Sequence, residues 1–200
     1  MSYSIIGSGG VGVALAGQFV RSGITVGIAN RRGPDSITSI AKKLGDKVVP
    51  LSLQDALKAD VIILAIPFWS HRDVAKALPT WQGKVVIDVT NAYGVPLSDL
   101  DNQLSSAIVA KALPGAHLVK AFNHLPAGVL AQDPAIAGGH RVIFVSGDDE
   151  SAVATVTALV RRLGYAPVSL GTLAQGGQLV QARDKSWAPL IFQDLFKREA

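Results

Sequence analysis

The stretch Ser4-Ile5-Ile6-Gly7-Ser8-Gly9-Gly10-Val11-Gly12, near the N-terminus, decides the fold. Its glycines fit the pattern G-x-G-x-x-G directly behind a short apolar run that is typical of a strand. The first glycine permits a tight turn, the second lets the backbone approach a pyrophosphate, and the third lets the next helix pack closely. Because residues 13–20 continue as an amphipathic helix, the pattern predicts a dinucleotide-binding unit with the pyrophosphate at the helix N-terminus.

The next expected strand ends without the acidic residue that would select NAD. Residues 25–29 read as this strand, and Asn30-Arg31-Arg32 follow where an NAD-binding chain usually carries Asp or Glu for the ribose 2′-hydroxyl. A guanidinium can pair with a 2′-phosphate through two hydrogen bonds and can stack on adenine. The sequence therefore predicts NADP(H) as the cofactor. The alternative is that both arginines are solvated loop charges.

Composition limits the other function classes. The chain has 200 residues, 48% hydrophobic and 17% charged, with no cysteine. These values favour one domain with a large core, and the lack of cysteine excludes disulfides, thiolate metal sites and cysteine nucleophiles. The net charge of +4 comes from scattered residues, which does not support nucleic-acid binding. Because we find no signal peptide and no apolar run of about 20 residues, we expect a cytoplasmic chain without a membrane partner.

Strand and helix patterns alternate along the chain, which predicts a Rossmann-type, doubly wound, mostly parallel α/β sheet with a short C-terminal α/β extension. The expected strands cover residues 3–6, 25–29, 47–50, 61–65, 85–88, 117–121, 141–145 and 167–170. The expected helices cover residues 11–21, 37–44, 51–57, 71–78, 150–163 and 186–197. We expect a single NADP-binding domain, 1–200, with a dinucleotide-binding core at 1–125 and an extension at 126–200 that completes an acceptor cleft.

Ligands of open α/β sheets bind beyond the carboxyl ends of the strands, and several short stretches of this chain fall there. Pro67 alone can be interpreted as a strand terminator, and Asn91 alone as part of an Asx turn. The argument for ligand binding therefore rests on their shared location at the carboxyl ends of expected strands. Lys120, inside an expected strand, is interpreted as a sheet-edge or loop-facing cation rather than a base. The predicted cofactor-binding residues are Gly7, Ser8, Gly9, Gly10, Val11, Gly12, Asn30, Arg31, Arg32, Ala65, Ile66, Pro67, Asn91 and Ala92.

Several short motifs follow the glycine-rich turn in a fixed order. They are Asn30-Arg31-Arg32, Ala65-Ile66-Pro67, Asp88-Val89-Thr90-Asn91, Val119-Lys120-Ala121-Phe122-Asn123, Val145-Ser146-Gly147-Asp148-Asp149, Leu163-Gly164-Tyr165 and Leu170-Gly171-Thr172-Leu173-Ala174. Their order resembles that of the NADPH-dependent reductases of the coenzyme F420 (8-hydroxy-5-deazaflavin) family, along the chain to about Gly177. The architecture is also similar to the cytosolic reductase domain of transmembrane metalloreductases, where a flavin takes the hydride.

The resemblance implies hydride transfer between NADPH and a flavin-like acceptor, either coenzyme F420, FMN or FAD. In such a reaction the protein stacks two rings and excludes water, so no obligatory acid or base is expected. We expect the acceptor to contact Phe68, Asn123 and His124, and the resemblance implies a lid that includes Ala137 and Gly138. Many relatives have a small hydroxyl residue at the position of His124. His124 can be interpreted either as an acceptor contact or as an exposed loop histidine.

Other function classes stay open at this point. One is a reductase of a small carbonyl or imine substrate, and another is a non-catalytic NADP-binding sensor. A metal site is not expected, because the four histidines are too dispersed for a ligand motif. The expected partner is a small-molecule redox acceptor, and a homodimer is one arrangement that the sequence allows.

Overall fold

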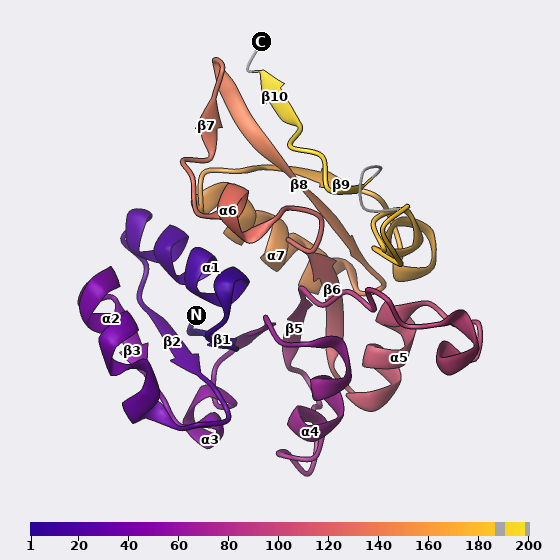
Figure 1. Cartoon of the computed structure of the whole chain (residues 1–200), viewed down its shortest axis with the longest axis horizontal. Helices are drawn as coiled ribbons and strands as arrows, with labels where there is room; N and C mark the ends of the chain where they lie inside the picture. The colour runs from indigo at the N-terminus through magenta and orange to yellow at the C-terminus, as the bar shows by residue number, and fades with distance from the viewer. Residues whose placement is uncertain (187–190, 199–200) are drawn as a thin grey trace.

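The computed structural model describes residues 1–186 and 191–198 and shows a twisted sheet with helices on both faces (Figure 1). Strand β1 (Tyr3–Ile6) lies beside β2 (Val26–Ala29) and β4 (Val61–Leu64), and every residue of these three strands is buried. Strands that are apolar along their whole length are typical of a parallel sheet covered on both faces. The N-terminal glycine-rich turn therefore follows a strand at the centre of the sheet.

The strand order confirms the predicted fold class. The parallel strands run β3 (Val48–Pro50), β2, β1, β4, β5 (Val85–Asp88) and β6 (His117–Ala121). This is the order of dinucleotide-binding sheets, with the chain reversing direction across the sheet between β1 and β4. The C-terminal extension adds β8 (Gly139–Gly147), antiparallel to β6, and β9 (Ala166–Ser169), parallel to β8.

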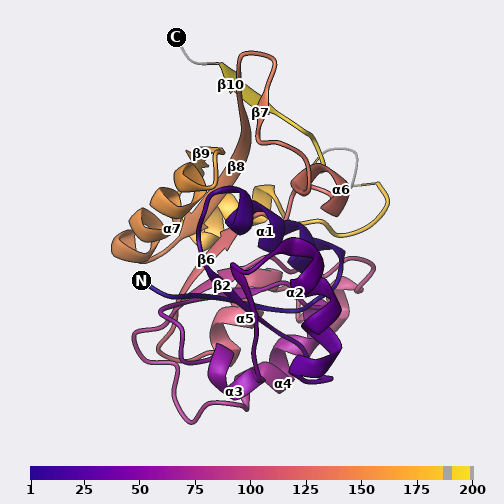
Figure 2. The same cartoon turned by 90° about the vertical axis from the view of Figure 1, so that its left-hand side faces the viewer.

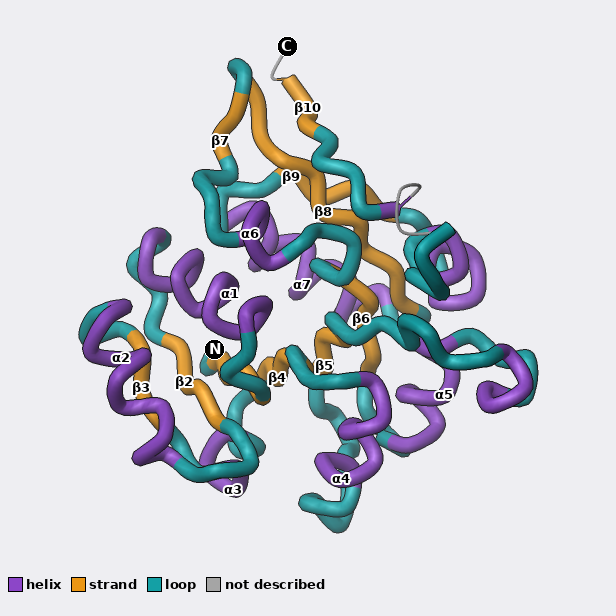
Figure 3. Tube along the Cα trace, viewed as in Figure 1, coloured by secondary structure: helices purple, strands orange, loops and turns teal. Residues whose placement is uncertain are grey.

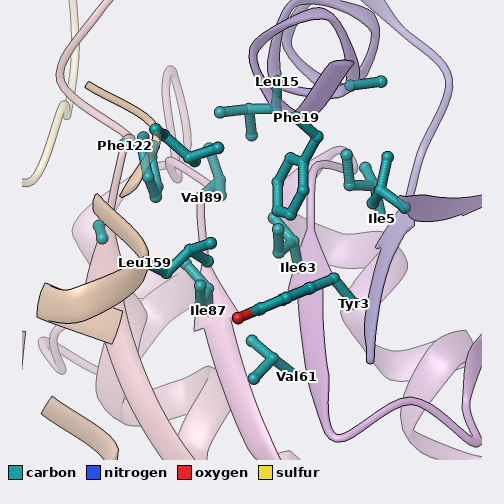
Figure 4. Packing of buried hydrophobic residues seen from close by; sticks show 14 of the residues in the cluster. Tyr3, Ile5, Leu15, Phe19, Val61, Ile63, Ile87, Val89, Phe122 and Leu159 are labelled. Carbon is teal, nitrogen blue, oxygen red and sulfur yellow. The ribbon is translucent and has the colours of Figure 1, made fainter. Parts of the chain in front are cut away.

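Two groups of helices cover the two faces of the sheet, as the purple segments of Figure 3 show. One buried cluster contains side chains of α1, α2 and α7, and the other contains side chains of α4 and α5. On the first face, the Phe19 ring of α1 packs 5.3 Å from the ring of Tyr3 (Figure 4). The helices are α1 (Gly10–Arg21), α2 (Thr38–Leu44), α3 (Leu53–Ala56), α4 (His71–Ala75), α5 (Ser105–Ala112), α6 (Ala127–Leu130) and α7 (Glu150–Arg162).

Helix α7 shows how local sequence sets an element boundary. Asp149 caps its N-terminus by accepting a hydrogen bond from the Ala152 N–H at 2.7 Å. Arg161 and Arg162 lie in the last turn, where positive charge complements the helix dipole. Shorter helical segments are the 3₁₀ turns Pro34–Ile37, Phe68–Ser70 and Leu97–Leu100 and a π-helix at Leu173–Gly177.

The prediction of a helix over residues 186–197 is wrong at its C-terminal end. Residues 187–190 lie outside the described part of the chain, but Phe196–Arg198 form a strand, β10, antiparallel to β8. The physical reason is the length of β8, which extends past the end of β6 and leaves backbone groups to be paired. Strands β10 and β7 (Ala135–Ile136) pair with this free end of β8 (Figure 2). The sequence interpretation also missed α5.

Candidate functional site

A pocket of about 360 Å³ lies where β1, β2 and β4 end, at the carboxyl edge of the sheet. We call it the carboxyl-edge pocket. It brings together predicted cofactor-binding residues from three separate stretches of sequence. Its lining residues are Ile6, Gly7, Ser8, Gly9, Asn30, Arg31, Leu53, Ala65, Ile66, Pro67, Ser70, Asp73 and Val74. A larger concavity, about 580 Å³, lies in the C-terminal extension between α7 and β10, and none of the predicted cofactor-binding or acceptor-binding residues lines it.

The three fingerprint glycines have three different reasons to lack a side chain. Gly7 has a φ of +120°, and a Cβ there would lie 2.0 Å from the Ala65 carbonyl oxygen. A Cβ at Gly12 would lie 2.0 Å from the Gly7 carbonyl oxygen, so both glycines are required by the fold itself. Gly9 differs, because a Cβ there meets no heavy atom within 4 Å and would enter the pocket. The open space at Gly9 is where a pyrophosphate can approach the backbone.

The N-terminus of α1 is suited to an anion. Gly9 is the N-cap and supplies no side-chain hydrogen bond, and the first turn contains no acidic residue. The first N–H groups of a helix have no partner inside the helix, and the helix dipole makes this end positive. The pocket therefore combines free N–H donors, a partial positive charge and open space, which fits a bound pyrophosphate.

Asn30 joins the glycine-rich turn to the loop after β2. Its Nδ2 donates to Ser8 Oγ at 2.7 Å and to Ser36 Oγ at 2.9 Å, and its Oδ1 accepts from the Arg32 N–H at 2.8 Å. The Asn30 side chain is thus used to hold the loop. Arg31 lines the pocket, whereas Arg32 does not. Of the two predicted phosphate-binding arginines, Arg31 is therefore the one that the fold directs to the pocket.

The ends of β5 and β6 are tied together by two asparagine side chains. Asn91 Nδ2 donates to the Asn123 carbonyl oxygen at 2.7 Å, and Asn123 Nδ2 donates to Asn91 Oδ1 at 3.1 Å. Asn123 Nδ2 also donates to the Val180 carbonyl oxygen at 2.7 Å. The preceding residue, Phe122, has a φ of +62°, a backbone conformation uncommon for a residue with a side chain. Asn91 and Asn123 therefore act first within the protein, and neither lines the carboxyl-edge pocket.

The interpretation of Lys120 as a sheet-edge cation is wrong, whereas the alternative of a cation that faces a loop agrees with the structure. Its side chain is fully buried between β5 and the rest of β6, and its Nζ lies 2.9 Å from Asp88 Oδ2. The Nζ also donates to the Thr90 carbonyl oxygen. Strand β6 is central because β8 pairs with its outer edge, so a side chain on β6 has no route to a sheet edge.

His124 is buried rather than exposed or available to an acceptor ring. One of its ring nitrogens, Nε2, lies 3.1 Å from the Val142 carbonyl oxygen, and the ring packs 4.8 Å from that of Phe144. Burial lowers the pKa of His124 to about 4, so the ring is neutral at pH 7. The structure does place His124 in the turn after β6, but β8 covers this turn, so the side chain is not exposed.

The other predicted acceptor contacts also do not line the carboxyl-edge pocket. Phe68 is buried in the core cluster that contains Val74. Ala137 and Gly138 form the turn between β7 and β8, at the far end of the extension, so they do not cover the pocket as a lid (Figure 1). Sequence reasoning missed five residues that line the pocket: Ile6, Leu53, Ser70, Asp73 and Val74. Three of these residues, Ser70, Asp73 and Val74, follow closely after Pro67. Their location just after the end of β4 is the sequence feature that could have predicted them.

The comparisons with known proteins agree with this geometry. A family model described as coenzyme F420-dependent NADP oxidoreductase matches residues 2–92. Residues 2–92 therefore carry a domain of that family. The matched part contains the glycine-rich turn, the Asn30-Arg31-Arg32 stretch and the ends of β4 and β5. The chain is thereby placed among the NADP-dependent oxidoreductases.

Individual relatives extend the similarity along the chain. A solved structure of a hypothetical protein from Sinorhizobium meliloti is 44% identical, with a TM-score of 0.89, over 98% of this chain and 96% of that chain. A protein from Arthrobacter sp. FB24 described as an F420-dependent NADP reductase is 24% identical and shares the fold. The match covers 92% of this chain and 97% of that chain, with a TM-score of 0.72. Metalloreductase STEAP3 of Rattus norvegicus is 27% identical over 88% of this chain, which spans only 35% of that protein.

Within residues 1–186 and 191–198, no helix is long and apolar enough to cross a membrane. In the same part of the chain, no three histidine, aspartate or glutamate side chains gather as a metal site would require.

Proposed function

We propose that this protein is an NADP(H)-dependent oxidoreductase that transfers a hydride between NADPH and a flavin-like acceptor, either coenzyme F420 or a flavin. The carboxyl-edge pocket carries the proposal. It unites the open backbone at Gly9, the helix N-terminus of α1 and Arg31 in one pocket. NADP(H) has two anionic parts, the pyrophosphate and the 2′-phosphate. The helix N-terminus at Gly9 is suited to the pyrophosphate, and the Arg31 guanidinium is suited to the 2′-phosphate.

Each part of the site has its own role in this proposal. Gly7, Ser8, Gly9, Gly10, Val11 and Gly12 bind the pyrophosphate, and Arg31 binds the 2′-phosphate, with Asn30 holding the loop and Arg32 adding positive charge. Ala65, Ile66 and Pro67 form the wall after β4. Asn91 and Ala92 set the shape of the β5 end, where Brändén's rule places the nicotinamide side.

When bound, NADPH supplies the hydride, so the protein needs to orient the reactants and exclude water rather than supply a reactive side chain. The buried state of His124 and Lys120 fits this role, because neither side chain reaches solvent or the pocket. We infer that residues 1–125 form the dinucleotide-binding core and that residues 126–200 cover the acceptor side of it.

Cofactor binding is tested by titrating the protein with NADPH, NADH and 2′,5′-ADP and following intrinsic tryptophan fluorescence or heat. We expect NADPH to bind at least tenfold more tightly than NADH, because one charge-assisted contact contributes on the order of 1.5–3 kcal/mol. We also expect 2′,5′-ADP to compete with NADPH. Equal affinities for NADPH and NADH would contradict the proposal.

A further inference from the structure

We propose that Lys120 is a positioning residue, which fixes the turn after β5 so that the nicotinamide end of the cofactor is held in one geometry. This inference rests on the proposed function. Its basis is a fully buried ion pair beneath the carboxyl edge of the sheet, between Lys120 on β6 and Asp88 at the end of β5.

The contacts of this pair converge on the backbone of one residue of the turn, Thr90. Lys120 Nζ donates to the carbonyl oxygen of Thr90 as well as to Asp88 Oδ2. Asp88 Oδ1 accepts a hydrogen bond from the Thr90 N–H at 2.9 Å. Both backbone polar groups of Thr90 are therefore held by the two charged side chains, and the path of residues 88–91 is fixed.

Stability alone is a poor explanation for these charges. Both side chains are completely shielded from solvent, and transfer of two charges out of water costs much of what their attraction contributes. Replacement of a buried ion pair by apolar side chains of similar volume is often neutral or stabilising. An apolar pair, however, cannot form hydrogen bonds with the backbone N–H and carbonyl oxygen of Thr90.

The fixed turn leads directly into the asparagine pair. Asn91 follows Thr90, and its Oδ1 accepts from Asn123 Nδ2 and from the Ala182 N–H at 3.3 Å. The direction of the Asn91 amide therefore depends on the path of residues 88–91. Through this amide, the buried ion pair sets how the ends of β5 and β6 and the segment at residues 180–182 lie relative to one another. Lys120 touches none of the lining of the carboxyl-edge pocket, so it acts through the turn.

Three variants test the role. Lys120→Met removes the cation, and Lys120→Met/Asp88→Leu replaces the whole pair by apolar side chains. The matched control is Lys84→Met, because Lys84 lies at the opposite end of β5, where its Nζ donates to the Ala59 carbonyl oxygen at 3.1 Å. Each variant is assayed for thermal unfolding, for 2′,5′-ADP affinity and for NADPH affinity.

The adenosine end of the cofactor serves as an internal reference. We expect the double variant to unfold at or above the temperature of Lys120→Met and to bind 2′,5′-ADP within about twofold of the unaltered protein. We expect its NADPH affinity to fall by about tenfold or more, because only NADPH extends to the turn after β5. Lys84→Met should retain both affinities.

The inference is overturned if the double variant binds both ligands as the unaltered protein does, since the pair would then be structural only. It is also overturned if both affinities fall by the same factor, because the defect would not be local to the nicotinamide end. Failure of the proposed function has a different signature. In that case the unaltered protein binds NADPH, but none of the flavin-like acceptors is reduced by it. The ratio of the NADPH affinity to the 2′,5′-ADP affinity still tests the role of Lys120.

Discussion

Asn91 and Asn123 form a reciprocal pair across the ends of β5 and β6, in which each side-chain amide donates a hydrogen bond to the other residue. Their donor–acceptor distances are 2.7 Å and 3.1 Å. Asn123 is only 3% exposed, so its hydrogen bonds are made in the protein interior. The pair therefore couples two strands whose ends lie on the expected nicotinamide side of the sheet.

Removal of either asparagine should show that the pair acts as a unit. We expect Asn91→Ala and Asn123→Ala each to lower the free energy of unfolding, and the double variant to lose less than the sum of the two. A coupling energy of about 1 kcal/mol is expected for side chains in direct contact. Urea unfolding of the four proteins measures it, and strictly additive losses would show that the two amides act independently.

Gly9→Val should abolish NADPH binding and leave the fold intact. A Cβ at Gly9 meets no heavy atom of the protein within 4 Å, so the backbone there accepts a side chain that would then occupy the space expected for the pyrophosphate. Gly17→Val is the matched control, because Gly17 lies on the same helix and its Cβ would be 3.9 Å from Leu44 Cδ2. Circular dichroism and NADPH titration check both. Normal NADPH affinity in Gly9→Val would mean that the turn does not bind the cofactor.

Arg31→Ala should reduce the preference for NADPH over NADH more than Arg32→Ala does. Arg31 lines the carboxyl-edge pocket and Arg32 does not. We expect Arg31→Ala to weaken NADPH binding by on the order of 1.5–3 kcal/mol and to leave NADH binding nearly unchanged. Titration with each nucleotide measures the ratio. Equal effects of the two substitutions would contradict the assignment of Arg31, rather than Arg32, as the main contact of the 2′-phosphate.

The buried His124 should make the protein less stable in mild acid. Its folded-state pKa, about 4, lies below its ordinary value of 6.5, so the unfolded chain binds the proton more tightly. The stability contributed by the neutral ring is present above pH 6.5 and is lost as the pH falls toward 4. Between pH 7.5 and 5 the loss from this group is about 2 kcal/mol.

His124→Phe is the variant that isolates this effect. A phenyl ring can take the place beside Phe144 but cannot be protonated. We expect its free energy of unfolding, from urea titration at pH 7.5 and 5, to depend less on pH than that of the unaltered protein. His71 is also buried and its pKa is also lowered by burial, so some acid sensitivity should persist. An unchanged pH dependence in His124→Phe would contradict the assignment.

The sequence predicted the sheet well because the signals for parallel strands are local. The apolar runs at residues 3–6, 61–65 and 85–88 have no exposed face, and each is bounded by a turn. The glycine-rich turn was equally predictable, because its three glycines fit one short sequence pattern directly after the first strand. The carboxyl edge of the sheet then follows from strand direction alone.

The acceptor side was predicted poorly because distant segments determine it. His124 reads as a loop residue until β8 covers it, and β8 begins at Gly139. Lys120 reads as an edge cation until β8 pairs with β6 and makes that strand central. Ala137 and Gly138 lie in a turn whose location depends on the length of β8. Such placements depend on pairing between strands far apart in sequence, which no local pattern encodes.

The central claim is tested most directly by the oxidation of NADPH, followed at 340 nm, with oxidised coenzyme F420, FMN and FAD as separate acceptors. The account predicts a loss of absorbance that depends on the acceptor and on the protein, is much slower with NADH, and is abolished in Gly9→Val. Tight NADPH binding without oxidation by any of the three acceptors would contradict it and would identify a binding module instead.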